Sequence, residues 1–283
     1  MVLAFFWLLH LLPLPLLRAL GVLLGWMAWL GADSRRKVGL VNLKLCFPDE
    51  DEAWRRRVCR RHFVLFMQAL LDRSLMRWSS RSRLKRLVRV SGDEPINWQE
   101  RRPTILFGIH NVGLELGAAG LCAQTERTMA VIHSDQKNPV FDAFFIAARE
   151  RFGVSVSRNN GIRAAIRLIR ENLPLFYFPD QDFGASDSIF LPFFGVPTAT
   201  TRILPRLAQL TGARVVPHVT WLTPRGYEVE LFPPWDEYPS GDLHADITRI
   251  NEFAEASIRR APAQYFWLHK RFKTRPKGET PLY

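Results

Sequence analysis

The sequence contains little cysteine: Cys46, Cys59 and Cys122 are the only three in 283 residues. Their spacing fits neither a metal site nor an even-numbered disulfide framework, so we expect a protein of a reducing compartment. Internal repeats and low-complexity segments are also lacking. With 47% hydrophobic and 23% charged residues, the composition excludes a disordered chain and a polytopic membrane protein. The length allows one sizeable core or two modest ones.

Acidic residues are scarce in the segment from Trp54 to Arg89, where Asp72 is the only one. The same segment holds twelve basic residues, which account for most of the net charge of +12. They are Arg55, Arg56, Arg57, Arg60, Arg61, Arg73, Arg77, Arg81, Arg83, Lys85, Arg86 and Arg89. This block indicates a solvated helical face, contact with anionic lipid or docking of an acidic protein. Helix-turn-helix patterning and RNA-binding motifs are missing, so we expect no nucleic-acid partner.

The first 31 residues contain a single Lys or Arg, Arg18. About 20 apolar residues span a bilayer, so this stretch is long enough. Pro13 and Pro15 interrupt it, which leaves a tilted span, a re-entrant pair, a surface-lying helix and a buried core helix open. We expect residues 1–33 to be a membrane anchor. The basic run 35–37 that follows predicts a catalytic domain, residues 34–283, on the cytoplasmic face of the inner membrane.

The hydrophobic pattern predicts an α/β fold with a mixed, largely parallel sheet flanked by helices. Residues 34–100 read as a basic helical part and residues 101–283 as an α/β core. Strands are expected at 104–109, 128–133, 154–157, 173–178, 214–222 and 227–232, the last two as an antiparallel hairpin at one edge. Helices are expected at 113–123, 139–151, 161–172, 201–211 and 244–260.

The most informative motif is His110 followed by Glu115, after the apolar run 105–109. In a continuous helix the two side chains would lie about 140° apart. They can meet if His110 precedes the helix and Glu115 lies about one turn inside it, a bend that Gly113 permits. A histidine held by a carboxylate is a general base that works near neutral pH. The motif therefore predicts a catalytic pair, although a histidine on an apolar strand can also be a satisfied core residue.

Several further blocks stand in a recognisable order. They are Val41–Pro48, Arg158–Arg163, Pro179–Asp182, Phe190–Gly195 with Thr198–Thr201, and Pro262–Lys273. Together with His110 and Glu115 they resemble the bacterial lipid A biosynthesis (late) acyltransferases, within the lysophospholipid acyltransferase-like superfamily that carries His-x4-Asp/Glu. One position departs from the family pattern, which commonly has an aromatic residue where this chain has Leu114.

The resemblance implies transfer of a fatty acyl chain from acyl carrier protein to a hydroxyl of a lipid A precursor. No serine or cysteine nucleophile is required, so we expect direct transfer in a ternary complex. Backbone N–H groups of residues 111–113 are candidates for the oxyanion site. Acyl carrier protein, a lipid A precursor and membrane lipid are the expected partners, with no cofactor beyond the acyl donor. The alternative acceptors are a lysophospholipid, glycerol phosphate or another glycolipid, and thioester hydrolysis is a possible side reaction.

Four further residues are expected to bind substrate. Arg158 and Arg163 flank a predicted strand-to-helix turn, where guanidinium groups suit a phosphate, or else they mark an ordinary solvated helix start. Asp180 and Asp182 are expected to bind sugar hydroxyls or to orient a basic residue. The two acids also resemble part of a calcium loop, but the further ligands are missing, so we expect no metal.

Overall fold

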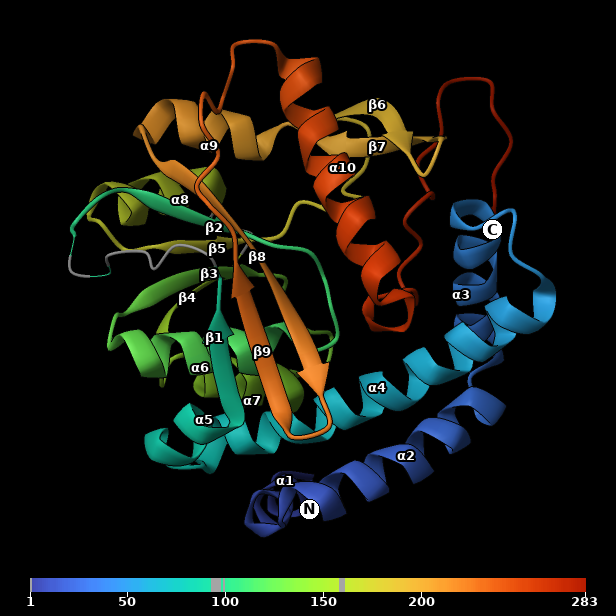
Figure 1. The fold of residues 1–283 in the computed structure, drawn as a ribbon, viewed down its shortest axis with the longest axis vertical. Coiled ribbons are helices and arrows are strands. Elements are labelled where there is room, and N and C mark those ends of the chain that lie inside the picture. The colour runs from blue at the N-terminus through green and yellow to red at the C-terminus, as the bar shows by residue number, and fades with distance from the viewer. Residues whose placement is uncertain (1, 93–97, 99, 158–160) are drawn as a thin grey trace.

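The computed structural model describes residues 2–92, 98, 100–157 and 161–283. Among these, seven strands form one sheet in the order β1-β9-β8-β2-β5-β3-β4 (Figure 1). The strands are β1 (Val88–Ser91), β2 (Thr104–Phe107), β3 (Met129–His133), β4 (Gly153–Ser157), β5 (Leu175–Tyr177), β8 (Arg214–Thr223) and β9 (Gly226–Leu231). All neighbouring strands pair in parallel except β8 with β9. The α/β class and the largely parallel sheet predicted from the pattern are confirmed.

Both faces of the central strands are buried under helices. Successive side chains of a strand point to opposite faces, so the residues of one strand belong to two different core clusters. On β2, Leu106 joins a core cluster with side chains of α4 (Glu52–Trp78), α6 (Leu114–Thr125) and α7 (Pro139–Arg149). Its neighbours Ile105 and Phe107 join a second cluster with side chains of α8 (Gly161–Arg170), α9 (Ile203–Thr211) and α10 (Leu243–Arg260). The sheet is therefore a middle layer between two layers of helices.

Each element expected from residue 104 onward agrees with the structure to within two residues at either end. The predicted antiparallel hairpin is β8–β9, joined through the turn at residues 224–225. Side-chain caps fix two helix starts, since Asn138 accepts N–H bonds at the start of α7 and Asp242 does so at the start of α10.

Two segments were predicted wrongly. Residues 88–91 were expected to continue a helix, but after the short α5 (Arg81–Leu87) they form β1, which pairs in parallel with β9. The β8–β9 hairpin is therefore covered on its outer side and is not the edge of the sheet. The segment 188–201, where the hydrophobic pattern predicts no strand, forms a separate two-stranded hairpin, β6 (Ser188–Phe193) and β7 (Val196–Thr201).

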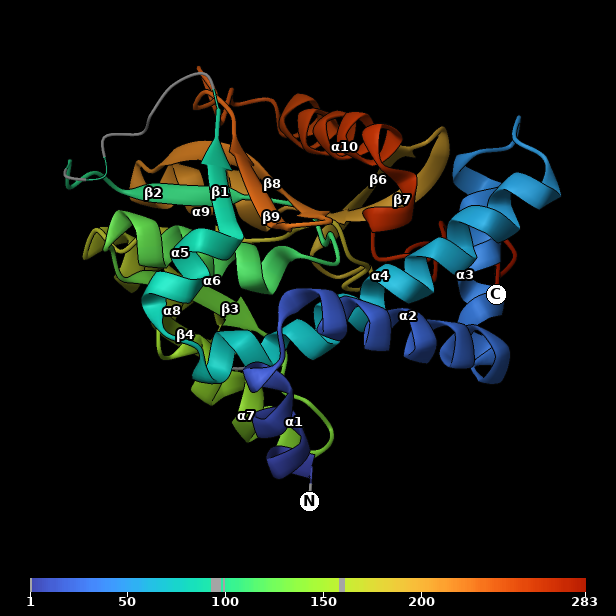
Figure 2. The ribbon, with the colours of Figure 1, turned by 60° about the horizontal axis from the view of Figure 1, so that its bottom comes forward.

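The apolar N-terminus forms two helices, α1 (Val2–Leu11) and α2 (Leu14–Gly31), which the break before Pro13 separates. Helix α2 runs beside α4 along one side of the molecule (Figure 2). It is long and apolar enough to cross a membrane by length and composition, with a mean hydropathy of 1.5. Arg18 of α2 faces inward, where its Nη1 lies 2.7 Å from Oδ2 of Asp72 on α4.

Helix α3 (Asp33–Cys46) holds the C-terminal segment in place. Asn42 is buried, and its Nδ2 donates to the carbonyl oxygens of Trp267 and His269 at 2.7 and 2.8 Å. Arg271 is also buried and donates to the carbonyl of Ala199 and to the hydroxyl of Thr200 on β7. These contacts hold the segment that follows the short helix η2 (Pro262–Gln264) against α3 and β7.

Candidate active site

The carboxyl ends of β2 and β5 bring His110 and Asp180 together. The two strands are direct neighbours and parallel, with Phe107 opposite Tyr177. Each chain continues three residues beyond its strand before it reaches the polar side chain. Side chains beyond the carboxyl ends of adjacent parallel strands share one edge of the sheet, where α/β proteins bind ligands.

His110 and Asp180 form a close pair. Nδ1 of His110 lies 2.6 Å from Oδ1 of Asp180, and the backbone N–H of His110 donates to Oδ2 at 2.9 Å. Asp180 is buried, whereas the side chain of His110 keeps 24% of its surface exposed. An ionised carboxylate only accepts hydrogen bonds, so Nδ1 carries the proton and Nε2 is the basic nitrogen of the neutral ring. Nε2 has no hydrogen bond to any described residue.

Asp180 is held as an anion in spite of its burial. Burial alone raises the pKa of its carboxyl, but attraction to His110 and the hydrogen bonds from the His110 side chain and backbone lower the pKa below its ordinary value. Tyr265 donates its hydroxyl proton to the Asp180 carbonyl at 3.2 Å. The imidazole is therefore oriented by an ionised carboxylate. Asp180 itself is held through its side chain by His110 and through its backbone carbonyl by Tyr265.

The wall of the site is packed closely around His110. The ring of Phe178 lies 5.4 Å from the imidazole, centre to centre. Gly108 admits no side chain, because a Cβ atom there would lie 2.7 Å from Cε1 of His218 and 2.9 Å from Phe178. Burial lowers the pKa of His218 to about 4, so this second histidine is a neutral packing group near neutral pH.

The predicted pairing of His110 with Glu115 is wrong. Arg149 of α7 donates to both oxygens of Glu115, from Nε to Oε2 at 3.1 Å and from Nη2 to Oε1. Arg73 of α4 adds a second cation at 3.7 Å. The correct partner of His110 is Asp180, which the sequence had suggested only as a substrate-binding or orienting acid.

The start of α6 explains the difference. The prediction required Glu115 to lie about one turn inside the helix, but α6 begins at Leu114 with Gly113 as its N-cap residue. Glu115 is therefore in the first turn and points toward α4 and α7. Burial raises the pKa of its carboxyl, but attraction to Arg149 and Arg73 outweighs burial and lowers that pKa to about 2.

The three other residues predicted to bind substrate are Arg158, Arg163 and Asp182. Arg163 is exposed in the first turn of α8. Arg158 lies outside the described residues. Asp182 is buried, and its carboxylate accepts bonds from the backbone N–H of Gly184 and from the backbone N–H and hydroxyl of Thr274. Its contacts support a role in fixing the C-terminal segment; substrate binding by these residues stays a prediction.

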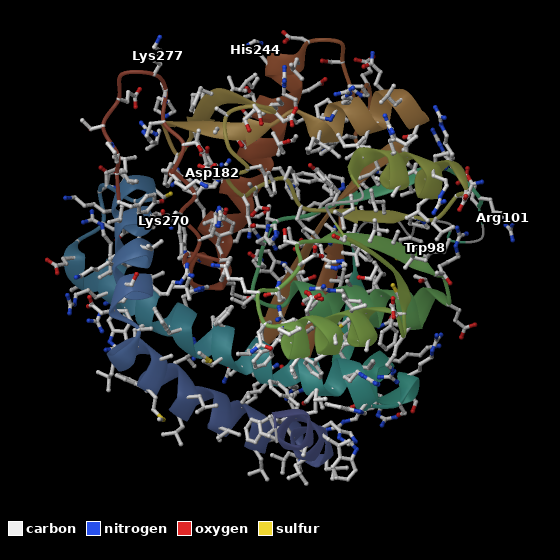
Figure 3. All side chains as sticks on the ribbon, turned by 180° about the vertical axis from the view of Figure 1, so that it is seen from behind. Trp98, Arg101, Asp182, His244, Lys270 and Lys277 are labelled. Atoms are coloured by element: carbon white, nitrogen blue, oxygen red, sulfur yellow. The ribbon has the colours of Figure 1, made fainter. Side chains whose placement is uncertain are left out.

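His269 contacts the backbone of Asp182. Its Nε2 accepts the backbone N–H of Asp182 at 3.0 Å. Burial, together with the nearby charges of His110 and Arg271, lowers the pKa of His269 to about 4. Figure 3 shows Asp182 beside the closing segment that carries Lys270. The segment 265–274 therefore supports the site through Tyr265, His269 and Thr274.

Of the backbone N–H groups expected at the oxyanion site, two are already used. Asn111 N–H donates to the carbonyl of Ile109 and Val112 N–H donates to that of Gln264. Gly113, at the N-terminus of α6, stays a candidate.

The three cysteines are buried, and burial raises the pKa of Cys59 and of Cys122 to about 12, which makes a thiolate nucleophile unfavourable near neutral pH.

Among the described residues, one group of side chains has atoms close enough to hold a metal ion. The ligand atoms of His133, Asp135 and Asp142 lie within 4.8 Å of one another. Asp142 Oδ1 already accepts the backbone N–H of Gln136, which gives it a local structural role. The expectation of an enzyme without a metal stays a prediction.

A histidine held by a buried aspartate at the carboxyl edge of a parallel sheet is an arrangement suited to acyl transfer. Comparison of the whole sequence identifies the family. The sequence profile of the bacterial lipid A biosynthesis acyltransferases matches residues 1–274. The protein belongs to this family and is an acyltransferase of lipid A biosynthesis.

Curated relatives match nearly the whole chain. The lipid A biosynthesis lauroyltransferase of Escherichia coli is 33% identical over 98% of this chain and 92% of its own length. The myristoyltransferase of the same organism is 32% identical over 95% of this chain and 83% of its own. A lipid A biosynthesis acyltransferase of Haemophilus influenzae is 30% identical, with 95% and 88% covered.

Among solved structures, the 1-acyl-sn-glycerophosphate acyltransferase PlsC of Thermotoga maritima is similar. It is 17% identical, with a TM-score of 0.41, and the alignment covers 86% of this chain and 96% of that one.

Proposed function

We propose that the protein transfers a fatty acyl chain from the thioester of acyl carrier protein to a hydroxyl of a lipid A precursor, with His110 as the general base. The observation that carries this proposal is the 2.6 Å contact between Nδ1 of His110 and Oδ1 of Asp180. The contact leaves Nε2 as a basic nitrogen on the partly exposed side of the ring. Asp180, and not Glu115, holds the imidazole in this proposal.

The chemistry follows from the weak acidity of an alcohol. A hydroxyl attacks a thioester slowly unless a base removes its proton as the new C–O bond forms. Nε2 of His110 takes that proton, and the ionised Asp180 stabilises the resulting imidazolium. The thiol of the carrier then leaves with the proton that His110 returns. The acyl group passes directly from sulfur to oxygen, without an acyl-enzyme.

The developing oxyanion needs a hydrogen-bond donor. Gly113 is the N-cap residue of α6, and the N-terminus of a helix presents free N–H groups with a partial positive charge. A side chain at residue 113 would meet the ring of Tyr227 at 2.9 Å. Because glycine has no side chain, the backbone of residue 113 can pack against Tyr227. Its N–H is the oxyanion donor in this proposal.

The acceptor is the finer point of the proposal. Lipid A precursors carry phosphate groups, and the exposed Arg163 at the start of α8 suits a phosphate, as does Arg158 five residues earlier in the sequence. Glu115 anchors Arg149 and Arg73 rather than the base. The family and the curated relatives support lipid A as the pathway.

The membrane is the third part of the proposal. Large apolar side chains are exposed on α1 and α2; they are Leu3, Phe5, Trp7, Leu8, Leu11, Leu16, Val22, Leu23, Trp26, Met27 and Leu30. The opposite side of α2, with Leu17, Arg18, Gly21 and Gly25, packs against α4. A helix with one packed and one apolar exposed face suits a position in the bilayer surface. We place the protein on the cytoplasmic face of the inner membrane.

Lipid A analysis tests the function. Mass spectrometry of lipid A from a strain without the gene should show the loss of one acyl chain, restored by the wild-type gene and not by His110→Ala. Loss of an acyl chain from phospholipid alone would refute the lipid A acceptor. With purified protein, an acyl-carrier-protein thioester should support transfer far better than the matching coenzyme A thioester.

A further inference from the structure

A groove lies along the edge of the molecule formed by α2 and α4. It has a volume of about 890 Å³ and lies between α2, α4, the β8–β9 turn and the segment after α10. Neither His110 nor Asp180 lines it. Figures 1 and 2 show α2 and α4 side by side along this edge of the molecule.

The charged residues that line this groove are all cations. They are Arg18 of α2, Arg57 and Arg61 of α4, and Arg259 of α10, and the lining contains no Asp or Glu. We call it the arginine groove. Its lining is otherwise largely apolar, with Trp54, Val58, Leu65 and Leu222 among its residues. Cations around an apolar surface suit a ligand that is anionic at one end and apolar at the other.

The arginines differ in how far their charge is balanced. Arg18 is buried and is neutralised by Asp72, but its Nε is buried without a hydrogen-bond partner in the described residues. Arg259 lies over the ring of Phe194, 4.6 Å from the centroid. Arg57 and Arg61 are exposed, and no described carboxylate pairs with either. The groove therefore has positive charge available for an anionic ligand.

The position of the groove favours a lipid over an acidic protein. One wall is the start of α2, the helix that exposes the apolar side chains Leu16, Val22 and Trp26. Arg60, next to Arg61 on α4, lies over the ring of Trp26 at 4.8 Å. A tryptophan beside basic residues is typical of the boundary between bilayer and water. In the proposed membrane attachment, the arginines would lie at the level of the lipid phosphates.

We propose that the arginine groove binds the headgroup phosphate of an anionic phospholipid, whose acyl chains lie along the apolar face of α2. This inference rests on the proposed membrane attachment and goes beyond catalysis, because neither His110 nor Asp180 lines the groove. The bound lipid would fix the rotation of the protein on the bilayer.

The test measures binding of the full-length protein to vesicles of phosphatidylcholine and to vesicles that also contain phosphatidylglycerol. Each basic residue near an anionic surface contributes roughly a fivefold factor in affinity. The double variant Arg57→Gln/Arg61→Gln should therefore bind phosphatidylglycerol vesicles about 25-fold more weakly than the wild type. Its binding to phosphatidylcholine and its acyl transfer in detergent should stay unchanged.

A matched control on the same helix is Arg56→Gln/Arg77→Gln, which removes two positive charges outside the groove. An equal loss in this control would mean diffuse surface electrostatics and overturn the proposal. A groove variant that binds phosphatidylglycerol as the wild type does, or that instead raises the KM for acyl carrier protein, would overturn it as well. If the wild type fails to bind even phosphatidylcholine vesicles, the proposed membrane attachment is what fails.

Discussion

Arg149 holds both carboxylate oxygens of Glu115, so the acid of the His-x4-Glu motif is bound to a cation and not to the motif's histidine. The side chains of Glu115 and Arg149 are 18% and 11% exposed, and Nη2 of Arg73 lies 3.7 Å from Oε1 of the same carboxylate. The three groups join α6 to α7 and α4. We infer that Glu115 fixes these helices around the site.

The variant Glu115→Gln tests this structural role. It leaves Arg149 and Arg73 without a neutralising charge, and removal of one partner of a buried ion pair costs about 3–5 kcal/mol. Because the groups are partly exposed, we expect a loss near the lower limit in the free energy of unfolding, measured by denaturant titration. The double variant Glu115→Gln/Arg149→Met should recover part of the loss, since it removes both charges. No change in stability for Glu115→Gln would contradict the structural role.

In contrast to Glu115→Gln, the variant Asp180→Asn should lose activity rather than stability. An amide in place of the carboxylate no longer stabilises the imidazolium and can hold the wrong tautomer, which lowers kcat by about 10⁴-fold in a hydrolase triad. We expect a fall in kcat of that order for acyl transfer, with KM changed only a few-fold and the fold retained. Steady-state kinetics with an acyl-carrier-protein thioester measures both quantities. A kcat close to wild type would show that His110 does not depend on Asp180.

The parallel core was predictable because its strands are buried on both faces and appear as short apolar runs between helical stretches. The same topology contained the signal for the correct pair. His110 and Asp180 each follow a predicted strand, and ends of parallel strands meet when the strands are neighbours. The strand order was not predictable from the sequence, so Glu115, five residues from His110, was the more obvious partner.

Other features depended on contacts between distant segments. The segment 88–91 becomes a strand because β9 offers it a pairing edge, from Val88 opposite Tyr227 to Ser91 opposite Glu230. Arg18 reads as an interruption of a membrane span, but its partner Asp72 is 54 positions away in the sequence and lies on another helix. Tertiary partners of this kind leave no local pattern in the sequence.

Stability should fall on mild acidification because of His62. This histidine is fully buried on α4, its Nδ1 donates to the carbonyl of Ala263 at 3.1 Å, and burial lowers its pKa from 6.5 to about 4. Between these values the unfolded chain binds more protons than the folded one, so stability is lost as the pH falls from 6.5 to 4. The full contribution of one such group is about 3 kcal/mol.

The variant His62→Asn keeps a donor for Ala263 and removes the titration. Its free energy of unfolding should vary less with pH between 6.5 and 4 than that of the wild type, by up to about 3 kcal/mol. His244→Asn is the control, because His244 is exposed at the start of α10, as Figure 3 shows. An identical pH dependence for wild type and His62→Asn would argue against a neutral buried imidazole at this position.

The contact between α2 and α4 depends on two glycines. A Cβ atom on Gly25 would lie 2.5 Å from the backbone Cα of Val64, and one on Gly21 would lie 2.8 Å from that of Gln68. Backbone atoms cannot move aside as a flexible side chain can, so Gly25→Ala must push the helices apart. We expect a loss of about 1–3 kcal/mol, as for other overpacked contacts.

Gly31→Ala makes the same change at the end of α2, where a Cβ atom meets nothing within 4 Å. It should be neutral or slightly stabilising, because alanine has the higher helix propensity. Hydrogen exchange of the α2 amides, measured with the protein bound to vesicles, should increase in Gly25→Ala and stay unchanged in Gly31→Ala. If α2 instead left α4 to cross the bilayer as a separate helix, both substitutions would have the same effect, because neither glycine would contact α4.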